Sequence, residues 1–446
     1  MSLNNIPGPK GIPVFGMALE FSKDPFAYAQ RVAEHRPIAA VAFPGMKLVY
    51  PLEPELIEQV LVTDAKKYVK GAFMSRLEIV FGDGILLAEG SDWKQHRRRM
   101  APAFTRQAVR EMSSAIGPIA VARLDSWADN EVRDIHVDMM AMTLEVVLQV
   151  LFGTSMSADR LAGVRHAFHD IATHFVGLNE MLGSFPLWVP TPGNLRFKRA
   201  RAKLDDIVAE ILAERRAAAS HGTDLLGRML TAADSDGAEL EEGQLQDEVR
   251  TLLLAGHETT AIALSTACFM LAQHPDSQDW VQEELDRIDG PITVDTPLPR
   301  LTAVLDEAMR LFPPAPVFPR EPIEDVSLGG HTIPAGTTIM VPPFMLHHDE
   351  RFFLEPELWH PQRWTPQLRA SLPRFAYFPF GGGPRICIGA HLAIGEARVV
   401  LGELLRRHRL SAVDGSQLKL VPSVTMRPGE PVEVRVHHRT RRTAAA

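Results

Sequence analysis

Residues 380–389 read FGGGPRICIG, and this stretch determines how the rest of the chain is interpreted. It contains one of only two cysteines, Cys387, which follows three successive glycines and Arg385. Glycine has no Cβ, so the backbone of such a loop can approach a flat ligand closely. A helix-like run begins at residue 390, and the N–H groups at a helix start can stabilise a thiolate and lower its pKa. These residue types together suit a cysteine thiolate that binds the iron of a planar macrocycle.

Three other interpretations of this cysteine compete with that one. A lone cysteine is most often a buried structural residue. A catalytic nucleophile needs a partner histidine, which sequence alone does not locate. A phosphate-binding loop carries Lys-Ser or Lys-Thr after its glycines, and neither pair occurs here.

The stretch matches the pattern F-x-x-G-x-R-x-C-x-G at every fixed position. This pattern resembles the haem-binding loop of the cytochrome P450 family of haem-thiolate proteins. The resemblance implies heme b (iron protoporphyrin IX) as the cofactor, with the Cys387 thiolate as the axial iron ligand. It also implies that Phe380 and Gly381 lie against the haem.

A second motif lies in a long apolar stretch, where residues 255–260 read AGHETT. The zinc-protease motif H-E-x-x-H is excluded because Ala261 stands at its last position. Helical threonines also commonly bond to the carbonyl one turn earlier and bend the helix without any further role.

The same segment resembles the oxygen-binding groove of the family's central helix, which carries an A-G-x-[DE]-T pattern. The resemblance implies that Ala255 and Gly256 lie where dioxygen and the haem meet the helix. It implies that Thr259 and Glu258 are catalytic, with the hydroxyl binding the iron-bound oxygen and the acid relaying protons.

Arginines at three places are candidates for binding the haem carboxylates. In residues 93–99, WKQHRRR, Trp93 and Arg97 are one helical turn apart on one face, although most charge runs are simply solvated surfaces. In the family this helix binds a haem propionate, and Arg385 and Arg320 match two further propionate-binding positions. The planar guanidinium fork grips a carboxylate through two hydrogen bonds.

Glu307 and Arg310 lie at i and i+3 on a predicted helix over residues 299–312. An exposed pair of this kind contributes under ~1 kcal/mol. The pair resembles the family's E-x-x-R motif, whose third member comes from a later meander and is Arg363 here, although Gln362 replaces the usual acid beside it. We expect a buried, fully satisfied network that holds the cysteine loop and does no chemistry.

The composition is that of an ordinary globular protein. Its 446 residues are 46% hydrophobic and 23% charged, which is enough to bury a cofactor, and the net charge of −8 argues against a nucleic-acid partner. Two cysteines fit a reducing cytosol. We expect a cytoplasmic protein without a membrane anchor, because the start shows no signal and the most apolar stretches contain charged or polar residues.

Periodicity predicts a mainly α protein with a minor β region. Helical patterns run from residue 54 to 274, and strand-like segments occur at 39–43, 48–50, 323–328 and 333–341. We expect one domain over residues 1–446, with a short flexible N-terminus and a basic C-terminal tail. The resemblance implies the family's triangular-prism fold, with the haem between the oxygen-groove helix and the helix after the cysteine loop.

The resemblance implies a monooxygenase that inserts one oxygen atom from O2 into an apolar organic substrate by hydroxylation or epoxidation. Fatty acids, terpenoids, steroids and similar molecules are the candidate substrates. No flavin or iron–sulfur motif follows Cys387, so electrons are expected from a ferredoxin or flavodoxin with its reductase, which could dock on the arginines at residues 97–99. The family topology gives these residues as pocket candidates: Phe73, Met74, Leu252, Ala255, Val317 and Val424.

Two alternatives remain. A peroxide-driven peroxygenase of the same fold typically lacks the acid–threonine pair, so Glu258 and Thr259 count against it. A non-catalytic haem sensor or carrier has no need of a proton relay.

Overall fold

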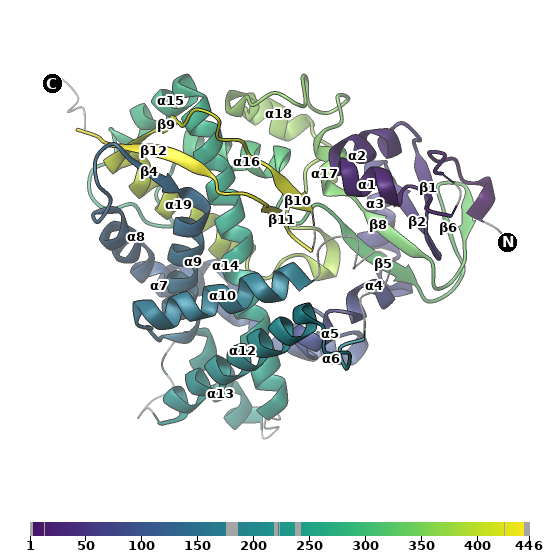
Figure 1. The fold of residues 1–446 in the computed structure, drawn as a ribbon, viewed down its shortest axis with the longest axis horizontal. Coiled ribbons are helices and arrows are strands. Elements are labelled where there is room, and N and C mark those ends of the chain that lie inside the picture. The colour runs from purple at the N-terminus through teal and green to yellow at the C-terminus, as the bar shows by residue number, and fades with distance from the viewer. Residues whose placement is uncertain are drawn as a thin grey trace.

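Helices make up most of the computed structural model, and the larger sheet is gathered at one side (Figure 1). The structure describes residues 3–12, 14–174, 186–217, 222, 224–236, 242–422 and 424–440. The expected mainly α fold with a minor β region is confirmed. The end of the expected basic tail, residues 441–446, lies outside the described residues, and the expectation of a single domain stays a prediction.

The longest helix, α14 (Glu242–Gln273), runs through the middle of the helical part. It packs against α9 (Ile135–Phe152), α12 (Pro192–Ala217), α16 (Pro299–Leu311) and α19 (Ala390–Arg407). Helices α9 and α14 are long and apolar enough to cross a membrane by composition, but 67% and 78% of their most apolar windows are buried inside the protein. The apolar character of both helices therefore serves the core.

Local sequence signals explain where α9 begins and ends. The carboxylate of Asp134 accepts hydrogen bonds from the N–H groups of His136 and Val137, which caps the first turn. The helix stops at Gly153, whose φ of 57° is left-handed and suits glycine.

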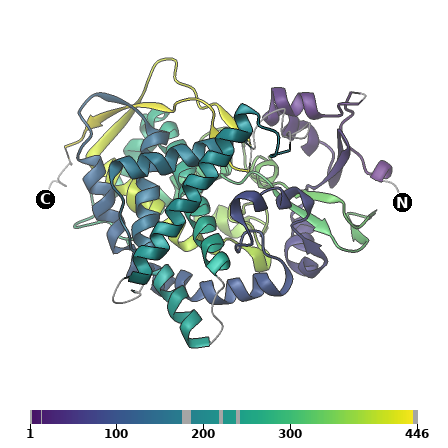
Figure 2. The ribbon, with the colours of Figure 1, turned by 60° about the horizontal axis from the view of Figure 1, so that its bottom comes forward.

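The larger sheet has the strand order β1-β2-β8-β5-β3. Its strands are β1 (Ile38–Phe43), β2 (Met46–Pro51), β8 (Thr338–Val341), β5 (Phe318–Pro322) and β3 (Tyr68–Val69). Figure 2 shows the purple N-terminal segments beside the green strands, on the side away from the C-terminus. Chain segments almost 300 residues apart are therefore joined in one sheet, for example by the parallel pairing of Leu48 with Thr338.

The strand predictions for the second half of the larger sheet need correction, because one strand was missed and one predicted run is divided. Strand β5 was not predicted, because prolines at 319 and 322 lack the N–H that a strand normally donates. The run predicted over 333–341 is divided between β7 (His331–Ile333) and β8, with a turn around Gly336 between them. Strand β7 pairs with β6 (Val326–Leu328) in a separate hairpin.

The remaining elements complete the helical body and three small sheets. The helices are α1 (Ala18–Lys23), α2 (Pro25–Ala33), α3 (Pro54–Glu58), α4 (Ala72–Ser75), α5 (Glu78–Phe81), α6 (Gly90–Met100), α7 (Arg106–Met112), α8 (Ile116–Leu124), α10 (Ala158–His174), α13 (Leu225–Asp236), α15 (Pro275–Leu285), α17 (Pro343–His347) and α18 (Pro366–Ser371). The strands are β4 (Glu131–Asp134), β9 (His408–Ala412), β10 (Leu420–Pro422), β11 (Met426–Pro428) and β12 (Glu433–His438). The short helical turns include η1 (Leu3–Asn5), η2 (Gln59–Thr63), η3 (Ala65–Lys67), η4 (Ala101–Phe104), η5 (Ser113–Ala115), η6 (Pro361–Arg363) and η7 (Gly383–Arg385).

Candidate active site

A cavity of about 460 Å³ lies between α14, the cysteine loop and β5. Most of its wall is apolar, and most of the residues predicted from the sequence lie on it. These are Met74, Trp93, Arg97, Leu252, Ala255, Gly256, Glu258, Thr259, Val317, Arg320, Phe380, Gly381, Arg385, Cys387 and Val424. The fold thus brings together side chains that are up to 350 residues apart in the sequence.

Phe73 is the exception among the predicted pocket residues. Its neighbour Met74 lines the cavity, whereas Phe73 packs against the apolar core beside the larger sheet. Helix α4 is only one turn long, so adjacent side chains point in different directions, and only one of the two faces the cavity. The structure therefore does not support Phe73 as a pocket residue.

Cys387 lies between η7 and the start of α19, and its N–H donates to the carbonyl of Phe380 (3.0 Å). The side chain is open to the cavity but lies deep inside the protein. This burial raises the pKa of the thiol, while the N–H of Gly389 and the charge of Arg97 act to lower it. The expectation of a lowered pKa is therefore wrong for the protein alone, because burial outweighs the N–H group. A metal ion bound to the sulfur would reverse this balance.

The three glycines before Cys387 do not share one role. A Cβ on Gly383 would lie 1.8 Å from the carbonyl oxygen of Leu61, and one on Gly382 would lie 2.4 Å from the ring of Phe375. These two glycines therefore allow the loop to pack against the protein itself. Gly381 has a φ of 73° and lines the cavity, so it fits the close approach to a ligand that the sequence predicted.

The threonine of the α14 motif faces the cavity and is hydrogen-bonded within its own helix. The Thr259 hydroxyl donates to the carbonyl of Ala255 (2.9 Å), so its oxygen is left to accept a hydrogen bond from a molecule in the cavity. This is the back-bonding that sequence analysis gave as the simpler explanation, and it does not exclude the catalytic one. Ala255 lies beside Thr259 with its small side chain exposed to the cavity.

Gly256 has a packing role that the sequence motif did not indicate. A Cβ at this position would point towards α9 and lie 3.1 Å from Val147. The glycine thus lets α14 and α9 approach each other closely, while its backbone still lines the cavity.

Glu258 lies one residue further along the same wall, where burial raises the pKa of its carboxyl. Its Oε1 accepts a hydrogen bond from the hydroxyl of Thr425 (3.2 Å), which lies in the turn between β10 and β11. The charge of Arg427 on β11 acts in the opposite direction on this pKa. A carboxyl whose pKa is raised in this way is better suited to both accept and release a proton than an exposed one.

Cationic side chains from the cysteine loop and α6 also line the cavity. Arg385 donates to the carbonyl of Ala88 (2.9 Å), pairs with Glu89, and lies over the ring of Trp93 with 4.6 Å between its guanidinium carbon and the ring centroid. Arg97 donates to the carbonyl of Ile386 (2.9 Å), next to the cysteine. The two predicted arginines therefore fasten the cysteine loop to α6 and to the segment just before it.

Arg320 and Lys70 complete this group. Burial lowers the pKa of Arg320 to about 10, and the charge of Arg385 acts in the same direction. Burial lowers the pKa of Lys70 to about 7, again reinforced by Arg385 and Arg320 and opposed by Glu89. Lys70 was not predicted, because a lysine that follows a two-residue strand carries no motif. We call Lys70, Arg97, Arg320 and Arg385 the cation cluster.

These residues fit the haem that the family resemblance implies. Within the cation cluster, the charges of Lys70, Arg320 and Arg385 are mutually unfavourable, and the two carboxylates of haem would relieve this repulsion. Cys387 presents its sulfur to the same cavity as a soft iron ligand. The apolar remainder of the wall suits the macrocycle and an apolar substrate.

In the predicted acid–arginine network, the buried carboxylate and guanidinium groups satisfy one another's charges and hydrogen bonds. Glu307 and Arg310 are completely buried and form two hydrogen bonds of 2.9 Å with each other. Arg363 donates to the same carboxylate (3.0 Å), as do the N–H of His360 and the indole of Trp364 (2.9 Å each). Gln362, the departure from the family pattern, leaves these contacts in place.

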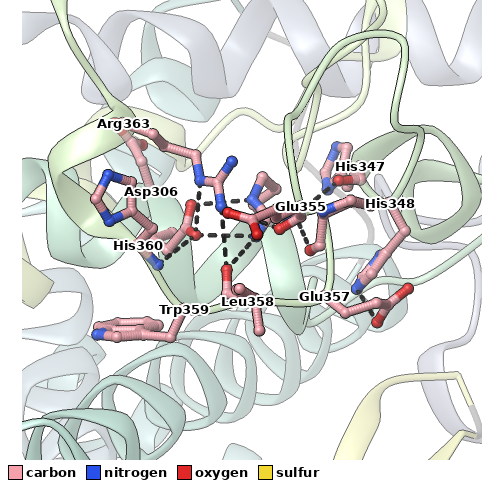
Figure 3. Close-up of polar contacts among 12 residues, drawn as sticks. Asp306, His347, His348, Glu355, Glu357, Leu358, Trp359, His360 and Arg363 are labelled. Carbon is pink, nitrogen blue, oxygen red and sulfur yellow. Dashed lines mark hydrogen bonds and ion pairs between the residues drawn. The ribbon is translucent and has the colours of Figure 1, made fainter.

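The network reaches the cysteine loop through a histidine to which sequence analysis gave no specific role. Arg310 donates to the carbonyl of His347 (3.0 Å), and the ring Nε2 of His347 accepts from the N–H of Phe378 (3.0 Å). Phe378 lies two residues before Phe380, where the loop begins. Figure 3 shows Arg363 and His360 on one side of this network and His347 on the other.

Comparisons with known proteins identify the family to which the chain belongs. A family model described as Cytochrome P450 matches residues 6–435. The crystal structure of the cytochrome P450DA heme domain superposes with a TM-score of 0.86 and 26% identity, covering 98% of both chains. The expected family and fold are both confirmed.

Several bacterial relatives are similar over almost their whole length. Cyclooctat-9-en-7-ol 5-monooxygenase from Streptomyces melanosporofaciens is 30% identical over 422 residues, which cover 92% of this chain and 90% of the relative. Cyclooctatin synthase from the same organism is 28% identical, covering 94% and 93%. Pentalenene oxygenase from Streptomyces avermitilis is 29% identical, covering 97% of each.

Proposed function

The chain belongs to the cytochrome P450 family and is a haem-thiolate monooxygenase, and we propose that Cys387 is its iron ligand and that its substrate is an apolar molecule of terpenoid type. The observation that carries this proposal is the shared cavity, in which Cys387 and the Glu258–Thr259 pair line one apolar space. The names of the related cyclooctat-9-en-7-ol 5-monooxygenase and pentalenene oxygenase support the substrate class.

Haem, when bound, supplies the activation of O2 and the insertion of one oxygen atom into a C–H or C=C bond. The chain's own residues would do the remaining work. The cation cluster would hold the haem carboxylates, and Cys387 would hold the iron. Thr259 would accept a hydrogen bond at its Oγ1, since its own proton is donated to Ala255. Glu258 would release and regain a proton at its carboxyl.

The substrate would be held mainly by shape and by exclusion of water. Much of the cavity wall consists of aliphatic and aromatic side chains with few polar atoms. Among the lining residues that support this are Leu77, Val80, Phe81, Leu151, Phe168 and Ile171. A hydrocarbon skeleton would gain about 25 cal/mol for each Å² it buries there.

Electrons would come from a ferredoxin or flavodoxin with its reductase, in the cytoplasm. Helix α6 supports this proposal, because Lys94 and Arg98 are exposed while Arg97 on the same helix reaches the carbonyl of Ile386. A basic surface this close to the cysteine loop would attract an acidic carrier protein and shorten the electron path.

The first test is the absorption spectrum of the purified protein, reduced and exposed to carbon monoxide. We expect a strongly red-shifted Soret band that disappears in a Cys387→Ala variant. A histidine-type carbonyl spectrum in the folded wild-type protein would overturn the ligand assignment. A panel of terpenoids would then be screened for spin-state shifts and for oxygenated product. Product that forms with hydrogen peroxide but not with a reducing system would instead indicate the peroxygenase alternative.

A further inference from the structure

The turn between β10 and β11 contacts both the substrate wall and the acid of the oxygen groove. Val424 and Thr425 line the cavity, and the Thr425 hydroxyl donates to Oε1 of Glu258. These contacts bring a segment from the end of the chain against the middle of α14, more than 160 residues away in sequence. We call Val424 and Thr425 the tip of this turn; it contacts both the cavity proposed for the substrate and Glu258.

The position of this tip is fixed by backbone hydrogen bonds. Strands β10 and β11 pair in an antiparallel hairpin, in which Val421 lies opposite Arg427. The N–H of Met426 donates to the carbonyl of Pro314, a cavity residue that follows α16 (2.9 Å). Thr425 is therefore held on two sides, and its hydroxyl defines where the Glu258 carboxyl rests.

Arg427 supplies the charge that acts on Glu258. It is half-buried on β11, and each of the two groups favours the charged form of the other, against the effect of burial. One further group interacts with this guanidinium, His136 at the start of α9, whose own pKa burial lowers to about 4; Asp134 acts on His136 in the opposite direction. A neutral His136 leaves Arg427 as the charge that faces Glu258.

We propose that Thr425 and Arg427 are positioning residues for Glu258, so that the β10–β11 turn sets both the orientation and the proton affinity of the acid. The inference rests on the proposed function, in which Glu258 carries protons to the oxygen groove. Because Val424 shares the turn with Thr425, a substrate that fills the cavity presses on the same segment that holds the acid. The turn thus couples the fit of the substrate to proton delivery.

The first experiment compares Thr425→Val with Thr425→Ser in the haem-loaded protein. Valine keeps the shape but removes the donor to Glu258, whereas serine keeps the donor. We expect product per reducing equivalent to fall about fivefold in Thr425→Val, the effect of one lost hydrogen bond, and to recover in Thr425→Ser. Equal yields in the wild type and Thr425→Val would overturn the positioning role of Thr425.

The second experiment measures Glu258 without turnover. The carbonyl stretch of its protonated carboxyl is followed by infrared spectroscopy as a function of pH, and Glu258→Gln identifies the band. Removing the positive charge in Arg427→Gln should move the titration midpoint upwards, while Arg427→Lys should restore it. An unchanged midpoint in Arg427→Gln would overturn the electrostatic role of Arg427.

The two proposals can fail separately. If the wild-type protein forms no oxygenated product with any reducing system, the proposed function fails, and the infrared titration still tests the contacts of Glu258. If the wild type forms product and neither variant differs from it, only the role of the β10–β11 turn is overturned.

Discussion

Two buried groups of charges flank the cysteine loop, and they differ in whether their charges are matched. In the acid–arginine network, five donated hydrogen bonds converge on the carboxylate of Glu307, and the paired guanidinium of Arg310 is completely buried. In the cation cluster, the charges of Lys70, Arg320 and Arg385 act unfavourably on one another, and Glu89 is the acid that acts on all three.

The difference separates a structural group from a binding group. A closed set of buried charges holds its neighbours in place and has nothing left to offer a ligand. A set with excess charge of one sign is unfavourable by itself and becomes favourable when an oppositely charged ligand enters. The pKa values of Lys70 and Arg320, lowered by burial and by neighbouring cations, express this excess.

The largest effect is expected from a substitution that removes a charge from the acid–arginine network. Glu307→Gln leaves Arg310 buried without a counter-charge, so we expect the free energy of unfolding to fall by about 3–5 kcal/mol. Urea unfolding followed by circular dichroism measures this change. The control is Glu430→Gln, because Glu430 pairs with Lys419 at an exposed site where such a pair contributes under ~1 kcal/mol. A loss in Glu307→Gln no larger than in the control would contradict the structural role.

The second prediction concerns the oxygen groove. If Thr259 takes part in proton delivery as proposed, Thr259→Ala should lower product per reducing equivalent by roughly tenfold or more, because reduced oxygen would leave without forming product. Stability should change little, because the hydroxyl bonds only within its own helix. Thr266→Ala is the matched control: its hydroxyl makes the same kind of bond, to the carbonyl of Ile262 (2.9 Å), two turns further along α14. Equal coupling in both variants would count against the relay.

The sequence alone predicted those parts of the site that consist of short local motifs. Three such motifs were recognised because each needs fixed residue types at a short spacing along the chain. They are the loop around Cys387, the α14 segment and the Glu307–Arg310 pair. The third network member, Arg363, was also found, since a later segment of the family pattern contains it.

The residues that sequence analysis missed act through contacts between segments that are distant in the sequence, so no local motif indicates them. Lys70 reaches the cation cluster because β3 joins β5 in the larger sheet. His347 and Thr425 come from a one-turn helix and a tight turn, whose sequences carry no catalytic pattern. The glycine motifs were found but only partly understood, because Gly256 and Gly383 serve close packing against α9 and η2, and both neighbours are distant in sequence.

The smallest predicted effect tests whether the cation cluster binds the haem carboxylates. Lys70→Gln should weaken haem binding about fivefold near pH 6, measured as the rate of haem transfer to an excess of a haem-free acceptor protein. The pH dependence gives the sharper result. The pKa of Lys70 is about 7 in the protein alone, and a bound haem carboxylate would raise this pKa. Above pH 7, Lys70 is therefore mostly neutral before haem binds and must take up a proton when haem binds. Wild-type affinity should therefore fall between pH 7 and 9, while Lys70→Gln stays flatter, and the two should converge at high pH. Parallel pH profiles would mean that Lys70 does not contact the haem, and the excess charge of the cluster would then have to be matched through Arg320 and Arg385.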